Sequence, residues 1–267
     1  MNQEILRSFR ELFSGYCRSF YSQNAEDQRN IILKEQHTHN VCRNIVRIAE
    51  EEYLKSEEIL LAEATALFHD IGRFRQYAEY KTFRDAISVN HATLGTTVLR
   101  EQGVLRRLPE REQTLILEAI KFHNVYALPR FEDLDALLFM KLIRDADKLD
   151  IWRVVMEYYD APDSDKASAV GLGLPDIPAY SEEILSYIFK GRIASLSAVK
   201  SLNDFKLLQL SWIYDLNFMP SLKIMLEQNY VNRIMKTLPQ TAEIKRVALV
   251  LEDHIQARFK DARKSRS

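Results

Sequence analysis

Apolar residues recur at steps of three and four along most of this chain, and that spacing places them on one face of an α-helix. Residues that interrupt helices are scarce, because the 267 residues include only seven glycines and seven prolines. The sequence therefore predicts an all-α fold in which helices pack as a bundle. Helices are expected near residues 2–22, 27–52, 56–71, 88–102, 109–124, 132–158, 181–190, 203–216, 220–236 and 241–263.

The hydrophobic content of 46 % is enough for one continuous core, so a single domain over residues 1–267 is expected. Glycine, proline and small polar residues gather between Asp160 and Tyr180, in a segment interpreted as a surface connection, with a lid as the alternative. The later helices, over residues 181–263, are predicted to form a C-terminal helical cap, with a homodimer face as the alternative.

The charge balance limits the partners of the chain. Its 37 basic and 38 acidic side chains leave a net charge of -1, which argues against general nucleic-acid binding. The two cysteines, Cys17 and Cys42, exclude a disulfide framework and a four-cysteine zinc site, and they favour a cytoplasmic location. No apolar run approaches the roughly 20 residues that cross a bilayer, and charges interrupt the first residues, so neither a membrane partner nor a signal peptide is expected.

Five of the six histidines fall in the first half of the chain, and helical phase separates those that face the core from those that do not. His37 is in phase with the apolar Val41 and Ile45, whereas His39 is in phase with Arg43. His37 is therefore a candidate metal ligand, and His39 is predicted to lie at the surface.

The pair His69-Asp70 lies in the last turn of a helix expected to begin at an N-cap Ser56 and to stop at Gly72. Adjacent helical positions diverge by about 100°, so the imidazole and the carboxylate can approach one site from two sides. A carboxylate in that place could also bridge two metal ions.

His91 and His123 also share their helix faces with apolar residues. His91 follows a helix start at Ser88, and Gly95 on the same helix would let another backbone come close. His123 is in phase with Ile120 at the end of its helix. Both imidazoles are therefore predicted to point inward.

Three carboxylates follow in the segment LLFMKLIRDADKLD. Asp147 and Asp150 are in register with the apolar Ile143, whereas Asp145 is flanked by lysines and is interpreted as a surface ion-pair residue. Asp147 is the candidate ligand, with Asp150 one turn later as the alternative. Four histidines and two aspartates would be costly to bury unpaired, whereas a pair of divalent metal ions would satisfy all of them.

These segments resemble the HD-domain superfamily of metal-dependent phosphohydrolases, whose signature is a first His, a His-Asp pair and a distal Asp. The matching residues are His37 in HTHNVCRNIVRIAE, His69-Asp70 in LAEATALFHDIGRF and Asp147 in LLFMKLIRDADKLD. The resemblance implies an HD metal-binding core over residues 27–160. The GYP extension of the cyclic-di-GMP phosphodiesterase branch is absent, which leaves the substrate open.

The segments VNHATLG and AIKFHN supply His91 and His123, an arrangement similar to that of members that hold two metals. The resemblance then implies one ion on His37, His69, Asp70 and Asp147, and a second on His91 and His123 through the shared Asp70. Asp70, His91 and His123 are also the predicted catalytic residues. Such mixed ligands suit Mn, Fe, Co, Ni or Zn, in one or two ions, with Mg as a further candidate.

A phosphate substrate needs positive charge, and basic side chains follow the His-Asp pair in GRFRQYAEYKTFRD, a segment between two predicted helices. The predicted phosphate-binding residues are Arg73, Arg75, Lys81, Arg84 and Lys148. Aromatic residues in the same segment could stack on a nucleobase, or could simply pack in the core. They are Phe74, Tyr77, Tyr80 and Phe83.

The function expected from these residues is hydrolysis of a phosphate mono- or diester of a nucleotide or a small phosphorylated metabolite, through a metal-activated water. One alternative is a di-iron oxygenase, since some relatives with this fold are similar in their ligands. The other is a non-catalytic binding or sensor module.

Overall fold

The computed structural model describes residues 1–162 and 170–264, and that part of the chain is helical without any strand, which confirms the all-α prediction. None of its helices is both long enough and apolar enough to cross a membrane. The chain divides into two compact units. The first comprises residues 1–151 and 162–172, and the second comprises residues 152–161 and 173–267.

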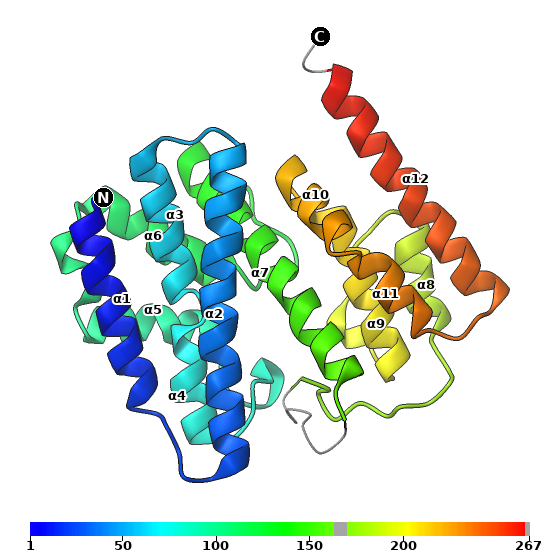
Figure 1. The fold of residues 1–267 in the computed structure, drawn as a ribbon, viewed down its shortest axis with the longest axis horizontal. Coiled ribbons are helices and arrows are strands. Elements are labelled where there is room, and N and C mark those ends of the chain that lie inside the picture. The colour runs from blue at the N-terminus through cyan, green and yellow to red at the C-terminus, as the bar shows by residue number, and fades with distance from the viewer. Residues whose placement is uncertain (163–169, 265–267) are drawn as a thin grey trace. The chain divides into compact units, whose positions relative to one another are not determined.

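In the part of the chain that the structure describes, the first unit is a bundle of six helices and the first part of a seventh, joined by turns (Figure 1). These are α1 (Gln3–Arg18), α2 (Ala25–Glu51), α3 (Ser56–Phe68), α4 (Ile71–Tyr80), α5 (His91–Glu101), α6 (Glu110–Phe122) and α7 (Leu134–Asp160). Two short 3-10 turns, η1 (Asp85–Ile87) and η2 (Val104–Arg107), lie before and after α5. Helix α3 packs against α1, α2 and α6, so it forms the centre of this unit.

Burial of aromatic side chains fastens α1 to the bundle. Leu6, Phe9 and Phe13 recur at three- and four-residue steps on one face of α1 and are buried. The ring of Phe9 meets that of Phe68 edge to face with centroids 5.3 Å apart, and the ring of Phe13 meets that of Phe74 at 5.9 Å. Full burial of each such ring stabilises the fold by about 1.5–3 kcal/mol.

The segment 56–71, predicted as one helix, is interrupted at His69 and Asp70. Helix α3 ends at Phe68, and α4 begins at Ile71, in a segment for which the sequence predicts no helix. The predicted N-cap Ser56 is also wrong by one position, since Lys55 caps α3 and its backbone N–H donates to Glu58 at 2.8 Å.

Gly72 does not end a helix, as predicted, but lies in the first turn of α4, where that helix crosses α5. A Cβ at Gly72 would lie 2.3 Å from the carbonyl oxygen of His91 and 2.6 Å from the backbone nitrogen of Gly95. Only glycine leaves room for so close a backbone contact. The prediction that Gly95 admits another backbone is therefore confirmed, and its neighbour is Gly72.

The second unit contains the last part of α7 and the C-terminal helices, of which α8 and α11 pack against α9. These are α8 (Glu182–Phe189), α9 (Leu202–Ser211), α10 (Met219–Glu227), α11 (Tyr230–Lys236) and α12 (Ala242–Lys264), with 3-10 turns η4 (Leu196–Ala198) and η5 (Trp212–Asp215). Every residue of α9 is buried, and the Trp152 indole N–H donates to the backbone oxygen of Gln209 at 3.2 Å.

The helix predicted over 220–236 is divided in two, because Asn229 takes a left-handed conformation with φ 55°. Asparagine tolerates this conformation better than most residues, and it separates α10 from α11. The prediction of one domain with a cap over 181–263 stays a prediction. Part of the segment from Asp160 to Tyr180, namely 163–169, lies outside the described residues.

Candidate metal centre

The six predicted ligands come from separate elements of the first unit, and the structure brings them together. They are His37 in the middle of α2, His69 and Asp70 between α3 and α4, His91 at the start of α5, His123 just after α6, and Asp147 within α7. All the imidazoles are buried. Two groups of three side chains are close enough to hold a metal ion, and Asp70 belongs to both.

Asp70 presents each of its carboxylate oxygens to a different pair of histidines. Its Oδ2 lies 3.6 Å from Nε2 of His37 and 3.7 Å from Nε2 of His69. Its Oδ1 lies 3.3 Å from Nε2 of His91 and 3.9 Å from Nε2 of His123. A carboxylate placed in this way can contribute one oxygen to each of two metal ions.

Asp147 completes the first group. Its Oδ1 lies 3.0 Å from Nε2 of His37 and 3.7 Å from Nε2 of His69. The Asp147 side chain is 16 % exposed, more than the other five ligands, so solvent reaches the centre on its side.

The Nδ1 atoms of the four histidines are all engaged on the other side of the ring. Those of His69 and His123 lie 2.7 Å from the backbone oxygens of Ala66 and Ile120. Carbonyl oxygens only accept hydrogen bonds, so both rings carry their proton on Nδ1 and leave an Nε2 lone pair toward Asp70.

Carboxylates occupy the same position behind the other two rings. Nδ1 of His37 lies 2.7 Å from Oδ2 of Asp150, and Nδ1 of His91 lies 2.7 Å from Oδ2 of Asp85. A carboxylate behind an imidazole fixes the tautomer and makes the free nitrogen a stronger metal ligand. Asp150, the alternative ligand on α7, is therefore placed behind His37 rather than among the Nε2 atoms.

Electron pairs face one another in the centre of this cluster. Nε2 of His37 and Nε2 of His69 are buried without a hydrogen-bond partner, and Nε2 of His91 lies 3.0 Å from that of His123. Buried acceptors that face a carboxylate are destabilising unless a cation lies between them. Imidazole nitrogens with carboxylate oxygens are a ligand set that divalent transition metals favour, so the residues fit a metal pair.

Burial and neighbouring charges shift the pKa values of the site residues in different directions. Burial alone would lower the pKa of His37, but the carboxylates of Asp147 and Asp150 raise it. Burial, with the charges of His91 and His69, lowers the pKa of His123 to about 3, and burial lowers the pKa of His91. Burial alone would raise the pKa of Asp70, but Lys34 and its other cationic neighbours hold it well below the usual range. The neutral imidazoles of His91 and His123, beside the ionised carboxylate of Asp70, are thus in the protonation states that bind a metal.

The sequence misplaced one acidic residue, Asp145, and gave no sign of another, Asp85. Asp145 is fully buried, so the prediction of a surface ion-pair residue is wrong. Asp85 carries no helical signal, because it lies in the 3-10 turn η1, and sequence reasoning missed it. Its carboxylate accepts hydrogen bonds from Arg73, Gln76 and Asn124, besides its contact with His91.

The predicted phosphate-binding residues lie in different surroundings. Arg73 reaches the centre, since its Nε is 3.4 Å from Oδ1 of Asp70, and this Nε is buried without a hydrogen-bond partner. Lys148 is buried and donates to the backbone oxygen of Arg144 at 3.3 Å.

The other three predicted phosphate-binding residues are not seen at the centre. Arg75 pairs with Glu79 and Glu101, each at 3.0 Å, and Lys81 pairs with Asp27 at 2.7 Å. Arg84 is exposed just before η1. Because residues 71–80 form helix α4, the side chain of Arg75 points toward Glu79 and Glu101. The sequence predicted no helix here and so could not predict these ion pairs.

One basic residue near Asp70 was missed from the sequence. Lys34 lies three residues before His37 on α2, and its ammonium donates to Oδ2 of Asp70 at 2.7 Å. The signal that could have found it is its helical phase, because residues three apart share a face.

Of the four aromatic residues, two are buried, and Tyr80 is 44 % exposed at the end of α4. Phe74 and Tyr77 are core residues, as the packing alternative expected. Phe83 is the aromatic residue of this segment beside the charged groups, with the ammonium of Lys34 5.5 Å from its ring centroid.

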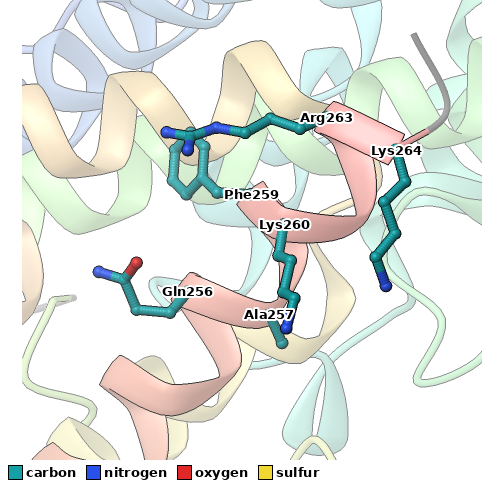
Figure 2. A pocket seen from close by; sticks show the side chains of 6 residues that line it. All are labelled: Gln256, Ala257, Phe259, Lys260, Arg263 and Lys264. Carbon is teal, nitrogen blue, oxygen red and sulfur yellow. The ribbon is translucent and has the colours of Figure 1, made fainter. Parts of the chain in front are cut away.

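A surface hollow in the second unit lies far along the sequence from these residues. Figure 2 shows it formed by consecutive turns of α12, with Lys260 and Arg263 among its lining. None of the predicted site residues lines it.

The first unit is all-helical and gathers buried histidines and aspartates around one shared carboxylate, a group of residues that could hold metal ions. Residues 35–152 match the family model of the HD domain, and this range contains all six predicted ligands. This segment is therefore identified as an HD domain, a domain found in metal-dependent phosphohydrolases. No curated protein and no solved structure matched the chain.

Proposed function

We propose that this protein hydrolyses a phosphate ester of a nucleotide or of a small phosphorylated metabolite. The observation that carries the proposal is the position of Asp70, whose two oxygens face two separate histidine pairs. This arrangement suits two divalent cations that share a carboxylate, and two adjacent cations suit phosphoryl transfer to water.

The ligands divide into two sets around Asp70. His37, His69 and Asp147 would hold one ion with its Oδ2, and His91 and His123 would hold the other with its Oδ1. When bound, such ions lower the pKa of a coordinated water from 15.7 toward about 7 and neutralise phosphoryl oxygens. Mn, Fe, Co, Ni and Zn are the candidates that these ligands favour.

The protein's own residues keep the ligand set in one geometry. Asp150 and Asp85 hold the rings of His37 and His91, and backbone oxygens hold the rings of His69 and His123. Because these hydrogen bonds fix the rings, little reorganisation would be needed to bind a metal.

Arg73 supplies positive charge beside the centre. Its Nη1 donates to Asp85 at 2.9 Å and to the backbone oxygen of Phe83, which fixes the guanidinium. Its Nε remains directed toward Asp70 without a hydrogen-bond partner. A planar guanidinium held in this way is suited to a phosphoryl oxygen.

The experiment is phosphate release from a panel of nucleotides and phosphoesters, measured on protein loaded in turn with Mn, Fe, Co, Ni, Zn and Mg. We expect turnover with at least one metal, and its loss in Asp70→Asn while the circular dichroism of the helices is retained. Bound iron with oxygen consumption and no phosphate release would instead indicate the oxygenase alternative. Failure to bind any metal would leave the binding or sensor module.

A further inference from the structure

Lys34 and the metal ligands converge on the same carboxylate oxygen. The ammonium of Lys34 lies 2.7 Å from Oδ2 of Asp70, the oxygen that also faces Nε2 of His37 and of His69. The side chain of Lys34 is 16 % exposed and that of Asp70 is 4 % exposed, so this ion pair is shielded from most of the solvent. The pair therefore sits where a cation of the first group would bind.

We propose that Lys34 is the counter-ion of Asp70 in the metal-free protein and binds a phosphoryl oxygen of the substrate in the metal-loaded protein. The inference rests on the proposed function, and it makes metal and phosphate binding cooperative. Without phosphate, the charge of Lys34 weakens metal binding. With the metal bound, the same charge strengthens phosphate binding.

The first half follows from charge. An ammonium within hydrogen-bond distance of a carboxylate oxygen competes with a divalent ion for that oxygen, and the two cations repel each other. Because the pair is shielded, this repulsion is screened less than at an open surface. A metal ion would therefore bind more tightly if Lys34 had no charge.

The second half follows from what surrounds the ammonium. Among the described residues, the Lys34 ammonium donates a hydrogen bond to Asp70. The ring of Phe83 lies beneath it at 5.5 Å, and the guanidinium of Arg73 lies 5.8 Å from the same ring. With Asp70 occupied by a metal ion, the Lys34 ammonium would lose its carboxylate partner, and an anion would neutralise its positive charge.

The partly exposed side chains of the centre lie around the Lys34–Asp70 ion pair. Lys34, Arg73 and Asp147 have side chains 16 %, 15 % and 16 % exposed, whereas the histidine ligands are at most 3 % exposed. A phosphoryl group that arrives from solvent would therefore meet these residues at the centre. This assigns to Lys34 the role of a substrate-binding residue with an anionic, phosphate-bearing ligand.

The chain offers a matched control. Lys81 also pairs with an aspartate, Asp27, at 2.7 Å, and its ammonium also lies 5.5 Å from an aromatic ring, that of Tyr77. Its side chain is 59 % exposed, and its partner is not a ligand of the centre. Lys81→Met therefore removes the same chemical group without touching Asp70.

The test is a pair of calorimetric titrations on wild type, Lys34→Met and Lys81→Met, first with Mn²⁺ alone and then with inorganic phosphate added to the Mn²⁺-loaded proteins. We expect Lys34→Met to bind Mn²⁺ about tenfold more tightly and phosphate about tenfold more weakly than wild type. Lys81→Met should match wild type in both titrations. Lys34→Arg should recover phosphate binding, and Lys34→Gln provides a second uncharged variant if the methionine disturbs folding.

The outcomes separate the two proposals. Unchanged or weaker Mn²⁺ binding in both uncharged Lys34 variants, or undiminished phosphate binding, overturns the role of Lys34 and leaves the metal centre standing. Absence of Mn²⁺ binding in wild type, with every candidate metal giving the same result, overturns the proposed function and the role of Lys34 together.

Discussion

Gly72→Ala should displace one half of the metal centre from the other. The added Cβ would lie 2.3 Å from the backbone oxygen of His91 and 2.6 Å from the backbone nitrogen of Gly95, whereas real Cβ contacts stay above 3.0 Å. Both obstacles are backbone atoms of α5, so α5 must move by about 0.7 Å or more. Metal ligands tolerate deviations of only about 0.2 Å, so His91 should no longer match Asp70.

The cost in stability can be estimated from the same contacts. Overpacking of a core contact costs about 1–3 kcal/mol, while alanine in place of glycine in a helix returns at most about 1 kcal/mol. We therefore expect Gly72→Ala to lower the free energy of unfolding by about 1–2 kcal/mol in urea titrations, and to lose one of two metal equivalents.

Two other glycines provide the controls. A Cβ at Gly95 would meet its nearest atom at 3.4 Å, and a Cβ at Gly15 would meet nothing within 4 Å. Gly95→Ala should therefore be nearly neutral, and Gly15→Ala, in the last turn of α1, should stabilise by up to about 1 kcal/mol. The reasoning is refuted if Gly72→Ala keeps wild-type stability and metal content, or if all three variants behave alike.

Three further predictions follow from the hydrogen bonds, exposure and pKa values of the centre. Asp85→Asn should lower metal affinity in the His91 group by about 10–100-fold in a chelator competition, and wild-type affinity would show that Asp85 does not orient His91. His37→Ala should lose metal, whereas the exposed His39→Ala should keep it and change the free energy of unfolding by less than about 0.5 kcal/mol; equal losses would contradict the helical phase. Because the pKa of His123 is lowered to about 3, the unfolded chain binds more protons below about pH 6.5, so the metal-free protein should lose stability as the pH falls below that value. In urea titrations across this pH range, the free energy of unfolding of His123→Gln should decline less steeply with falling pH than that of wild type. An equally steep decline would contradict the burial of a neutral ring.

Helical periodicity predicted much of the first unit, because a buried face leaves a repeating apolar signal in the sequence. The same phase argument placed His37, His91 and His123 on the inside and His39 at the surface, as the structure has them. It also found the close backbone contact at Gly95, although it did not identify the facing residue.

Periodicity could not find features that arise between elements. Asp85 lies in a 3-10 turn, and Lys34 is polar on a mostly buried face, so neither stands out until the partner is in place. The break between α3 and α4 was missed because apolar residues continue across it, with Ile71 directly after the pair His69-Asp70. Asp145 was misplaced because nearby lysines suggested solvent, while the tertiary packing of α7 buries it.

The most direct test of the metal centre is the metal content of wild type and three variants, measured by elemental mass spectrometry on protein purified without an affinity metal column. We predict about two equivalents in wild type, about one each in His69→Ala and His123→Ala, and little or none in Asp70→Ala. Equal metal content in wild type and Asp70→Ala would contradict a centre built on one shared carboxylate.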